Sequence, residues 1–208
     1  MTLEEYLQLA LRTWADRPAA DRLRNATLGI AGEAGEIVEV VKKHLYHGKS
    51  HEETRSKLEG ELGDLFYYTV IYIYERGWSE PAGSFYGIVR LFGKDVVPNW
   101  GSIQSSIKKV EEDDLFGMAV ALAQAAGSLT TTSAHHIKTV TGGGHIIPMD
   151  ARLAQMTLAE LLHYAILLGA EFDLSANEIA LANIDKLKAR HPDGWRQPTK
   201  RGSENGSH

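Results

Sequence analysis

Residues 28–41 read LGIAGEAGEIVEVV, and residues 61–73 read ELGDLFYYTVIYI. Each stretch is largely apolar and carries two acids three positions apart, an arrangement that places both carboxylates on one face of a helix. Two such helices packed side by side would bring four carboxylates together. The stretches therefore predict an all-α fold, a helical bundle built around this pair. The four acids are Glu33 and Glu36 in the first stretch and Glu61 and Asp64 in the second.

Carboxylates placed in apolar helices need a counter-charge. A divalent cation supplies one, and Mg²⁺ prefers carboxylate and phosphate oxygen as its ligands. The alternative is that both pairs lie on ordinary solvated faces of amphipathic helices, where such spacings recur by chance. Two pairs on strongly apolar helices favour the metal site.

Composition limits the classes of protein to consider. The chain has 208 residues, 43% of them hydrophobic, which is enough for a substantial core. Its net charge of −5 provides no overall basic field, so we expect no nucleic-acid partner. Cysteine is absent, which excludes disulfides and thiolate metal sites. Neither a leader sequence nor an apolar run of membrane-spanning length is evident, so we expect a cytoplasmic protein without a membrane partner.

Apolar periodicity and cap residues predict six helices. Thr2 is a suitable N-cap for the first, and Ser175 with Glu178 forms a capping box at the start of the last. Glycine and proline predict a loop near residues 79–101, and a triple glycine at 142–144 lacks the features of a P-loop. The expected helices cover about residues 2–15, 20–44, 51–76, 113–129, 157–172 and 175–190.

The domain organisation has two interpretations. Residues 1–196 form one helical domain, and residues 79–156 within it are either a linker or insertion, or a degenerate second repeat. The tail, residues 197–208, is expected to be disordered. The repeat rests on two weak similarities, in which most of the acids are lost. Unrelated helices rich in small residues would show the same similarity by composition alone. The two similarities pair residues 121–127 with 29–35 and residues 160–163 with 61–64.

Three runs and a lysine pair resemble the MazG-like all-α nucleoside triphosphate pyrophosphohydrolases, which are related to the dimeric dUTPase and dCTPase types. The runs are residues 28–36, 61–64 and 182–195, and the lysines are Lys42 and Lys43. The resemblance covers about residues 1–77 and 157–196. It implies a MazG-like bundle that uses Mg²⁺, or Mn²⁺ in its place, to hydrolyse a nucleoside triphosphate to a monophosphate and pyrophosphate. The role would be nucleotide-pool cleaning or supply, with dUTP or dCTP as possible preferred substrates.

The resemblance also implies roles for individual residues. Glu33, Glu36, Glu61 and Asp64 would hold the metal, and Glu33 or Glu36 would be the general base. Some relatives have a further glutamate where this chain has Gly32, so fewer metal ions are expected.

Phosphate contacts are expected from the last helix. Asn183, Lys186 and Arg190 share one of its faces, in a region where the family contacts substrate, and Lys43 is a secondary candidate. Basic residues near a helix C-terminus also simply complement the helix dipole.

Three further questions stay open at this stage. A helical hairpin that must cover its apolar face predicts a homodimer, unless an internal repeat covers it within one chain. The aromatic residues Trp14, Tyr67, Tyr68 and Tyr72 are expected to pack in the core, although one could stack on a nucleobase. The alternative function is a non-catalytic helical protein that binds a metal or a nucleotide for regulation.

Overall fold

The computed structural model describes residues 1–14, 17–78, 104, 114–141 and 148–194. Within them it contains helices and no strand, which confirms the all-α prediction. The loop predicted near residues 79–101, the triple glycine and the tail lie outside the described residues. The helices are α1 (Leu3–Leu11), α2 (Ala19–Tyr46), α3 (His51–Glu75), α6 (Leu115–Thr141), α7 (Pro148–Glu171) and α8 (Ala176–Arg190).

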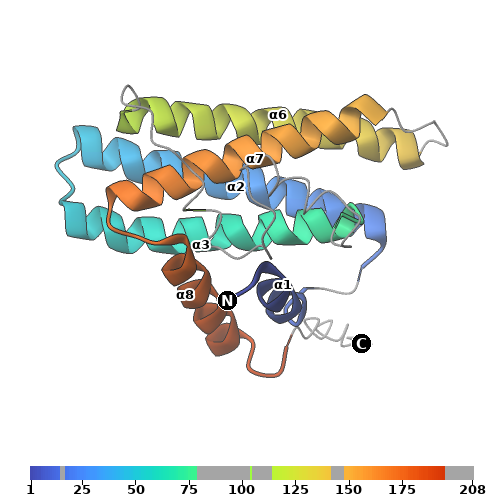
Figure 1. Cartoon of the computed structure of the whole chain (residues 1–208), viewed down its shortest axis with the longest axis horizontal. Helices are drawn as coiled ribbons and strands as arrows, with labels where there is room; N and C mark the ends of the chain where they lie inside the picture. Colours follow the sequence, from blue (N-terminus) through green and yellow to red (C-terminus); the bar gives the residue numbers. More distant parts are fainter. Residues whose placement is uncertain (15–16, 79–103, 105–113, 142–147, 195–208) are drawn as a thin grey trace, which may run out of the picture.

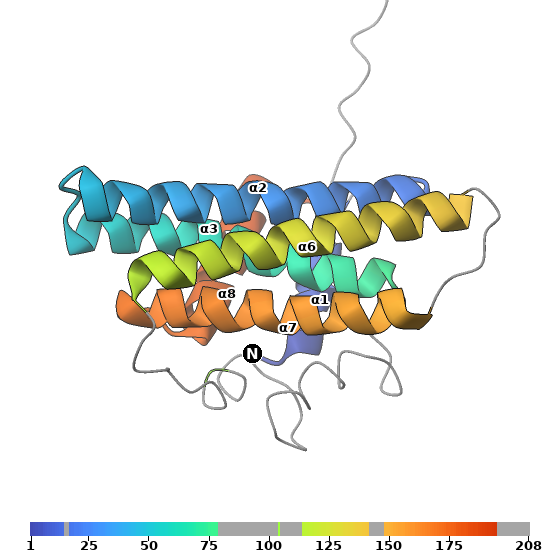
Figure 2. The same cartoon turned by 90° about the horizontal axis from the view of Figure 1, so that it is seen from above.

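Two long hairpins pack face to face. Helices α2 and α3 form the first hairpin and α6 and α7 the second, with α6 lying on α2 and α7 on α3 (Figure 1). Seen at right angles, the four long helices run nearly parallel to a common axis (Figure 2). The short helices α1 and α8 pack against α3 and against each other, below α3 in Figure 1. Helix α3 therefore contacts α1, α2, α7 and α8.

Capping boxes set the starts of three helices. Thr2 begins α1 with Glu5, Ser50 begins α3 with Glu53, and Ser175 begins α8 with Glu178. In each, the cap hydroxyl accepts a hydrogen bond from the backbone N–H three residues on, and the glutamate accepts from the N–H of the cap residue. The predicted caps at Thr2 and Ser175 are thus confirmed.

Helix α1 is shorter than predicted. It ends at Leu11 rather than near residue 15. Thr13 and Trp14 each donate their backbone N–H to a carbonyl three residues earlier, at 3.0 and 3.1 Å. This tighter winding closes the helix before Trp14.

Helices α6 and α7 are longer than predicted. The sequence predicts a helix over 113–129, but α6 continues to Thr141. The threonine run beyond the predicted end is accommodated because Thr130, Thr131 and Thr132 donate their hydroxyls to carbonyls four residues back, at 2.8, 3.0 and 2.9 Å. Helix α7 begins at Pro148 instead of near residue 157, and proline is well suited to a first helical position.

One continuous core joins the helices. Its largest fully buried side chains include Tyr6 from α1, Phe66 and Tyr72 from α3, and Phe172 just after α7. By length and composition, Leu115–Lys138 and Ala151–Glu171 would be able to cross a membrane, a test that core helices of bundles also pass. The prediction that no apolar run reaches this length is therefore wrong by this criterion. In this structure both segments pack against other helices of the bundle, with 33% and 61% of their windows buried.

Candidate metal and substrate site

Three of the four predicted metal ligands meet between α2 and α3. Glu33, Glu61 and Asp64 each offer one carboxylate oxygen, and these three oxygens lie within 4.8 Å of one another. All three residues are half-buried. Glu36 is exposed and lies outside this cluster, one turn further along α2. The packing of α2 on α3 thus brings together Glu33 from the first acidic pair and both acids of the second, whereas the sequence predicts that all four meet. Their role as metal ligands stays a prediction.

The cluster concentrates negative charge in a partly desolvated place. Burial, and after it the neighbouring carboxylates of Asp64, Glu36 and Glu61, together raise the pKa of Glu33 from 4.5 to about 7, while Lys186 opposes the shift. Burial also raises the pKa of Glu61, with Glu36 and Asp64 adding to the effect. A bound cation would relieve this repulsion.

The donor set suits a hard divalent cation. Among the described residues the cluster offers only carboxylate oxygens, the ligand type that Mg²⁺ and Mn²⁺ prefer. Mg²⁺ usually keeps several water molecules and takes oxygens from substrate phosphates. Three closely spaced carboxylates therefore fit such an ion.

Two predicted phosphate-binding residues hold Asp64. The Lys186 Nζ lies 2.6 Å from Asp64 Oδ1 and also donates to the Gly60 carbonyl at 3.2 Å. The Asn183 Nδ2 donates to the same Asp64 Oδ1 at 2.9 Å. Helix α8 therefore supports a metal-site carboxylate directly, and contact of these two residues with phosphate stays a prediction.

Asn183 is itself buried and supported from behind. Its Oδ1 accepts a hydrogen bond from the Tyr6 hydroxyl at 2.8 Å, and its side chain is 2% exposed. Gly63 makes room for it, because a Cβ at that position would lie 2.9 Å from Asn183 Cβ. Burial raises the pKa of the Tyr6 hydroxyl well above its ordinary value, so this group donates as a neutral phenol.

A pocket of about 320 Å³ opens beside Glu33 and Asp64. Glycine at position 29 allows the Tyr68 ring to lie against α2, since an added Cβ would overlap the ring. Tyr67 stacks edge-on against both Tyr68 and Trp14, with centroids 5.2 and 6.2 Å apart. The other lining residues are Thr13, Arg17, Asn25, Leu187, Arg190 and His191.

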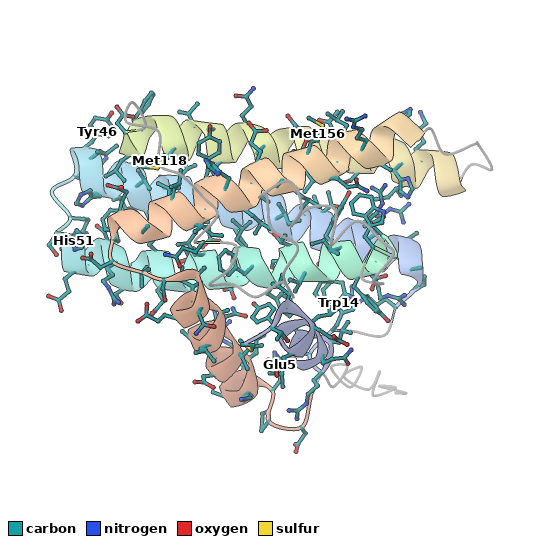
Figure 3. All side chains as sticks on the ribbon, in the orientation of Figure 1. Glu5, Trp14, Tyr46, His51, Met118 and Met156 are labelled. Atoms are coloured by element: carbon teal, nitrogen blue, oxygen red, sulfur yellow. The ribbon has the colours of Figure 1, made fainter. Side chains whose placement is uncertain are left out.

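Trp14 is fixed at one side of this pocket. It lies beyond the end of α1, near the C-terminal part of α3 (Figure 3). Its indole Nε1 donates to the buried carboxylate of Glu75 at 2.8 Å, and Arg22 donates to the same oxygen at 2.8 Å. The Glu75 carboxylate, outside the pocket, therefore holds the Trp14 ring in place at the pocket's side.

A second hollow of about 650 Å³ lies on the other side of the cluster, toward the α2–α3 turn. Glu36 and Glu61 belong to its lining, together with Lys43, Lys49 and Lys57. Lys43 lies 3.4 Å from Glu39 on the surface of α2. The predicted secondary candidate Lys43 thus borders the acidic site from the turn side, and Arg190 borders it from the aromatic side.

Sequence reasoning missed several residues of the site. Asn25 and Gly29 precede Glu33 by eight and four positions on α2, so helical spacing was the signal that could have found them. Tyr6 gives no such signal, because a tyrosine on the apolar face of α1 looks like any core residue. Its position relative to Asn183 depends on how α1 and α8 pack on α3.

One comparison with known protein families matches the first hairpin. Residues 23–78 match the model of the MazG nucleotide pyrophosphohydrolase domain. The matched segment contains most of α2 and all of α3, with all four acids. No curated protein and no solved structure matched the chain.

Proposed function

We propose that the chain is a hydrolase acting on nucleoside triphosphates, because its residues 23–78 match the MazG nucleotide pyrophosphohydrolase domain. The substrate is a nucleoside or deoxynucleoside triphosphate, and the products are the monophosphate and pyrophosphate. The reaction depends on Mg²⁺. The observation that carries this proposal is the cluster of Glu33, Glu61 and Asp64 at the junction of two hollows of different character.

The two hollows suggest how the substrate lies. The pocket beside Glu33 and Asp64 is lined by aromatic rings, which stack on nucleobases. The hollow beside Glu36 and Glu61 is bordered by three lysines, which can attract phosphate, and also by Glu39, Glu52 and Glu53. A phosphate chain there would therefore need a bound cation to offset the negative charge. We place the nucleoside in the first and the phosphate chain across the carboxylates toward the second.

The chain's own residues divide the chemical work. Glu33, Glu61 and Asp64 would hold Mg²⁺, which when bound neutralises triphosphate charge and lowers the pKa of water. Glu36 lies outside the cluster, so it is the carboxylate left to accept a proton from the attacking water. Lys186 keeps Asp64 in place and offsets part of the cluster's negative charge.

Base selectivity is a finer part of the proposal. Asn25 contributes an amide that both donates and accepts, and such a group can pair with the edge of a pyrimidine. The pocket volume of about 320 Å³ is at the small end of ligand sites. We therefore place dUTP and dCTP first among the substrates to be tested.

The test is pyrophosphate release from a panel of ribo- and deoxynucleoside triphosphates with Mg²⁺. The intact chain should release pyrophosphate with the monophosphate, and Glu36→Ala and Glu61→Ala should each lower kcat by about 100-fold or more. Asp21→Ala removes an exposed acid of α2 that pairs with Arg24, and it should leave the rate unchanged. A folded chain that releases no pyrophosphate from any nucleotide would contradict the proposal and favour the non-catalytic alternative.

A further inference from the structure

We infer that Tyr6 is a positioning residue for the metal site: its hydroxyl fixes the amide of Asn183, which in turn fixes the carboxylate of Asp64. The inference rests on the proposed metal dependence of the function. Tyr6 lies on α1, Asn183 on α8 and Asp64 on α3. Helices without a ligand of their own in the cluster would thus determine how one of its ligands is oriented.

The contacts form a continuous series of hydrogen bonds from Tyr6 to Asp64. The Tyr6 hydroxyl donates to Asn183 Oδ1 at 2.8 Å, and Asn183 Nδ2 donates to Asp64 Oδ1 at 2.9 Å. Tyr6 and Asn183 are 0% and 2% exposed, so water does not compete for the bond between them. A hydrogen bond in such a place is costly to lose, because its partner is left unsatisfied.

The donor-to-acceptor direction of these hydrogen bonds follows from the chemistry of Asp64 and Tyr6. An ionised carboxylate only accepts hydrogen bonds, so the Asn183 amide must turn its NH₂ toward Asp64. Its oxygen then points away and requires a donor, which the phenol of Tyr6 supplies. Without this donor the amide loses the group that selects its orientation.

This series of hydrogen bonds ends on one oxygen of Asp64. Lys186 Nζ approaches the same Oδ1 at 2.6 Å, so both donors converge there. The second oxygen of the carboxylate carries neither bond and can serve a metal ion. Gly63 contributes by lacking a Cβ. The Cβ of an alanine there would lie 3.1 Å from Asn183 Nδ2 and would push the amide away from α3.

Any buried tyrosine needs a hydrogen-bond partner, so the test must separate positioning from packing. Tyr72 provides the matched control. It is equally buried, on α3, and its hydroxyl bonds Ser133 Oγ at 2.8 Å and accepts from Arg76 at 2.8 Å. Tyr72→Phe removes a buried phenol as Tyr6→Phe does, but its partners belong to no part of the site.

The experiment is titration of the nucleotide-free chain with Mn²⁺. Electron paramagnetic resonance measures the concentration of free Mn²⁺ at each step. Outer-sphere hydrogen bonds typically contribute about 10- to 100-fold to metal affinity. We expect Asn183→Ala to weaken Mn²⁺ binding about 10-fold or more, and Tyr6→Phe, one bond further away, about 3- to 10-fold. Tyr72→Phe should bind Mn²⁺ as the wild type does. In an Asn183→Ala background, Tyr6→Phe should weaken binding no further.

Three results would overturn the inference. One is a folded Tyr6→Phe chain, or an Asn183→Ala chain, that binds Mn²⁺ as tightly as the wild type. Another is equal weakening by Tyr6→Phe and Tyr72→Phe. The third is a wild-type chain that binds no Mn²⁺. Pyrophosphate release by the same preparations distinguishes the two proposals, because weakened Mn²⁺ binding without hydrolysis would contradict only the function.

Discussion

At the scale of single residues, two missing side chains shape the site. Gly29 leaves the space that the Tyr68 ring occupies, and Gly63 leaves the space that Asn183 occupies. Both glycines lie within helices, where glycine is unfavourable by up to about 1 kcal/mol relative to alanine. The close contacts that they permit place an aromatic ring beside Glu33 and an amide beside Asp64.

Gly29→Ala should disturb the nucleoside pocket without disturbing the metal ligands. The new Cβ overlaps the Tyr68 ring, which is half-buried and will be displaced toward the pocket or solvent. We expect KM for the preferred nucleotide to rise several-fold while Mn²⁺ affinity is unchanged. Gly127→Ala on α6 is the control, because a Cβ there meets nothing within 4 Å. Unchanged KM in Gly29→Ala would contradict the placement of the nucleoside beside Tyr68.

Glu33 should make the metal-free protein less stable as pH rises. Its pKa is about 7 in the folded chain and 4.5 in the unfolded one, so the folded state holds its proton more tightly. The stabilisation from this proton is complete below about pH 4.5 and is lost as pH rises through about 7. With a chelator present, Glu33→Gln should therefore flatten the fall in Tm between about pH 5 and pH 8.

Glu39→Gln is the control for this pH dependence. Lys42 lowers the pKa of the exposed Glu39 on the same helix, so its contribution has the opposite sign. A Glu33→Gln protein whose Tm falls with pH as steeply as that of the wild type would contradict the assignment. Thermal unfolding at a series of pH values provides the measurement.

The sequence identified the acids of the site better than their supports. Glu33, Glu61 and Asp64 were predictable because their spacing follows the helical repeat on two apolar helices. The Tyr6–Asn183 bond joins residues far apart in the chain, and no local periodicity reports such a contact. Glu36 shares the spacing of the others, yet its position on the helix surface leaves it outside the cluster.

At the scale of helices, α8 depends on its cap. The Ser175 hydroxyl accepts from the Glu178 N–H at 3.2 Å, and Glu178 accepts from the Ser175 N–H at 2.9 Å. Such boxes fix where a short helix begins, and α8 spans only 15 residues. The register of α8 in turn places Asn183 and Lys186 against Asp64.

Ser175→Ala should destabilise the chain by about 1 kcal/mol, because it removes the N-cap acceptor. The loss should appear in denaturant unfolding as a lower midpoint with an unchanged slope. Ser175→Asp keeps an acceptor at the cap and should unfold close to the wild type. Equal destabilisation by both changes would show that the hydroxyl does not act as a cap.

Helix boundaries were predictable where local signals agree with the packing. Helices α2, α3 and α8 match their predicted ranges closely because apolar periodicity agrees with the turn residues between them, and α3 and α8 also begin at capping boxes. Helix α6 extends beyond its predicted end through Thr130, Thr131 and Thr132, residues of low helix propensity. Its packing on α2 and α7 outweighs that preference.

At the scale of the whole molecule, the second hairpin covers the first. Helix α6 packs along α2 and α7 contacts α3, so the face of the acidic hairpin that needs an apolar partner finds one in the same chain. Leu122, Leu129 and Leu161 are fully buried within this shared core. That the second hairpin descends from a copy of the first stays a prediction.

We therefore expect the chain to be a monomer in solution. A hairpin that must bury its apolar face dimerises only when that face is otherwise exposed, and here α6 and α7 already cover it. Light scattering with size exclusion should give the mass of one chain at micromolar concentration. A stable dimer would contradict this and would require another surface, such as the face of α6 on which Phe116 and Val120 are exposed. Val120→Arg would then restore the monomer if that face mediates contact, and it would leave the dimer intact if the hairpins themselves exchange between chains.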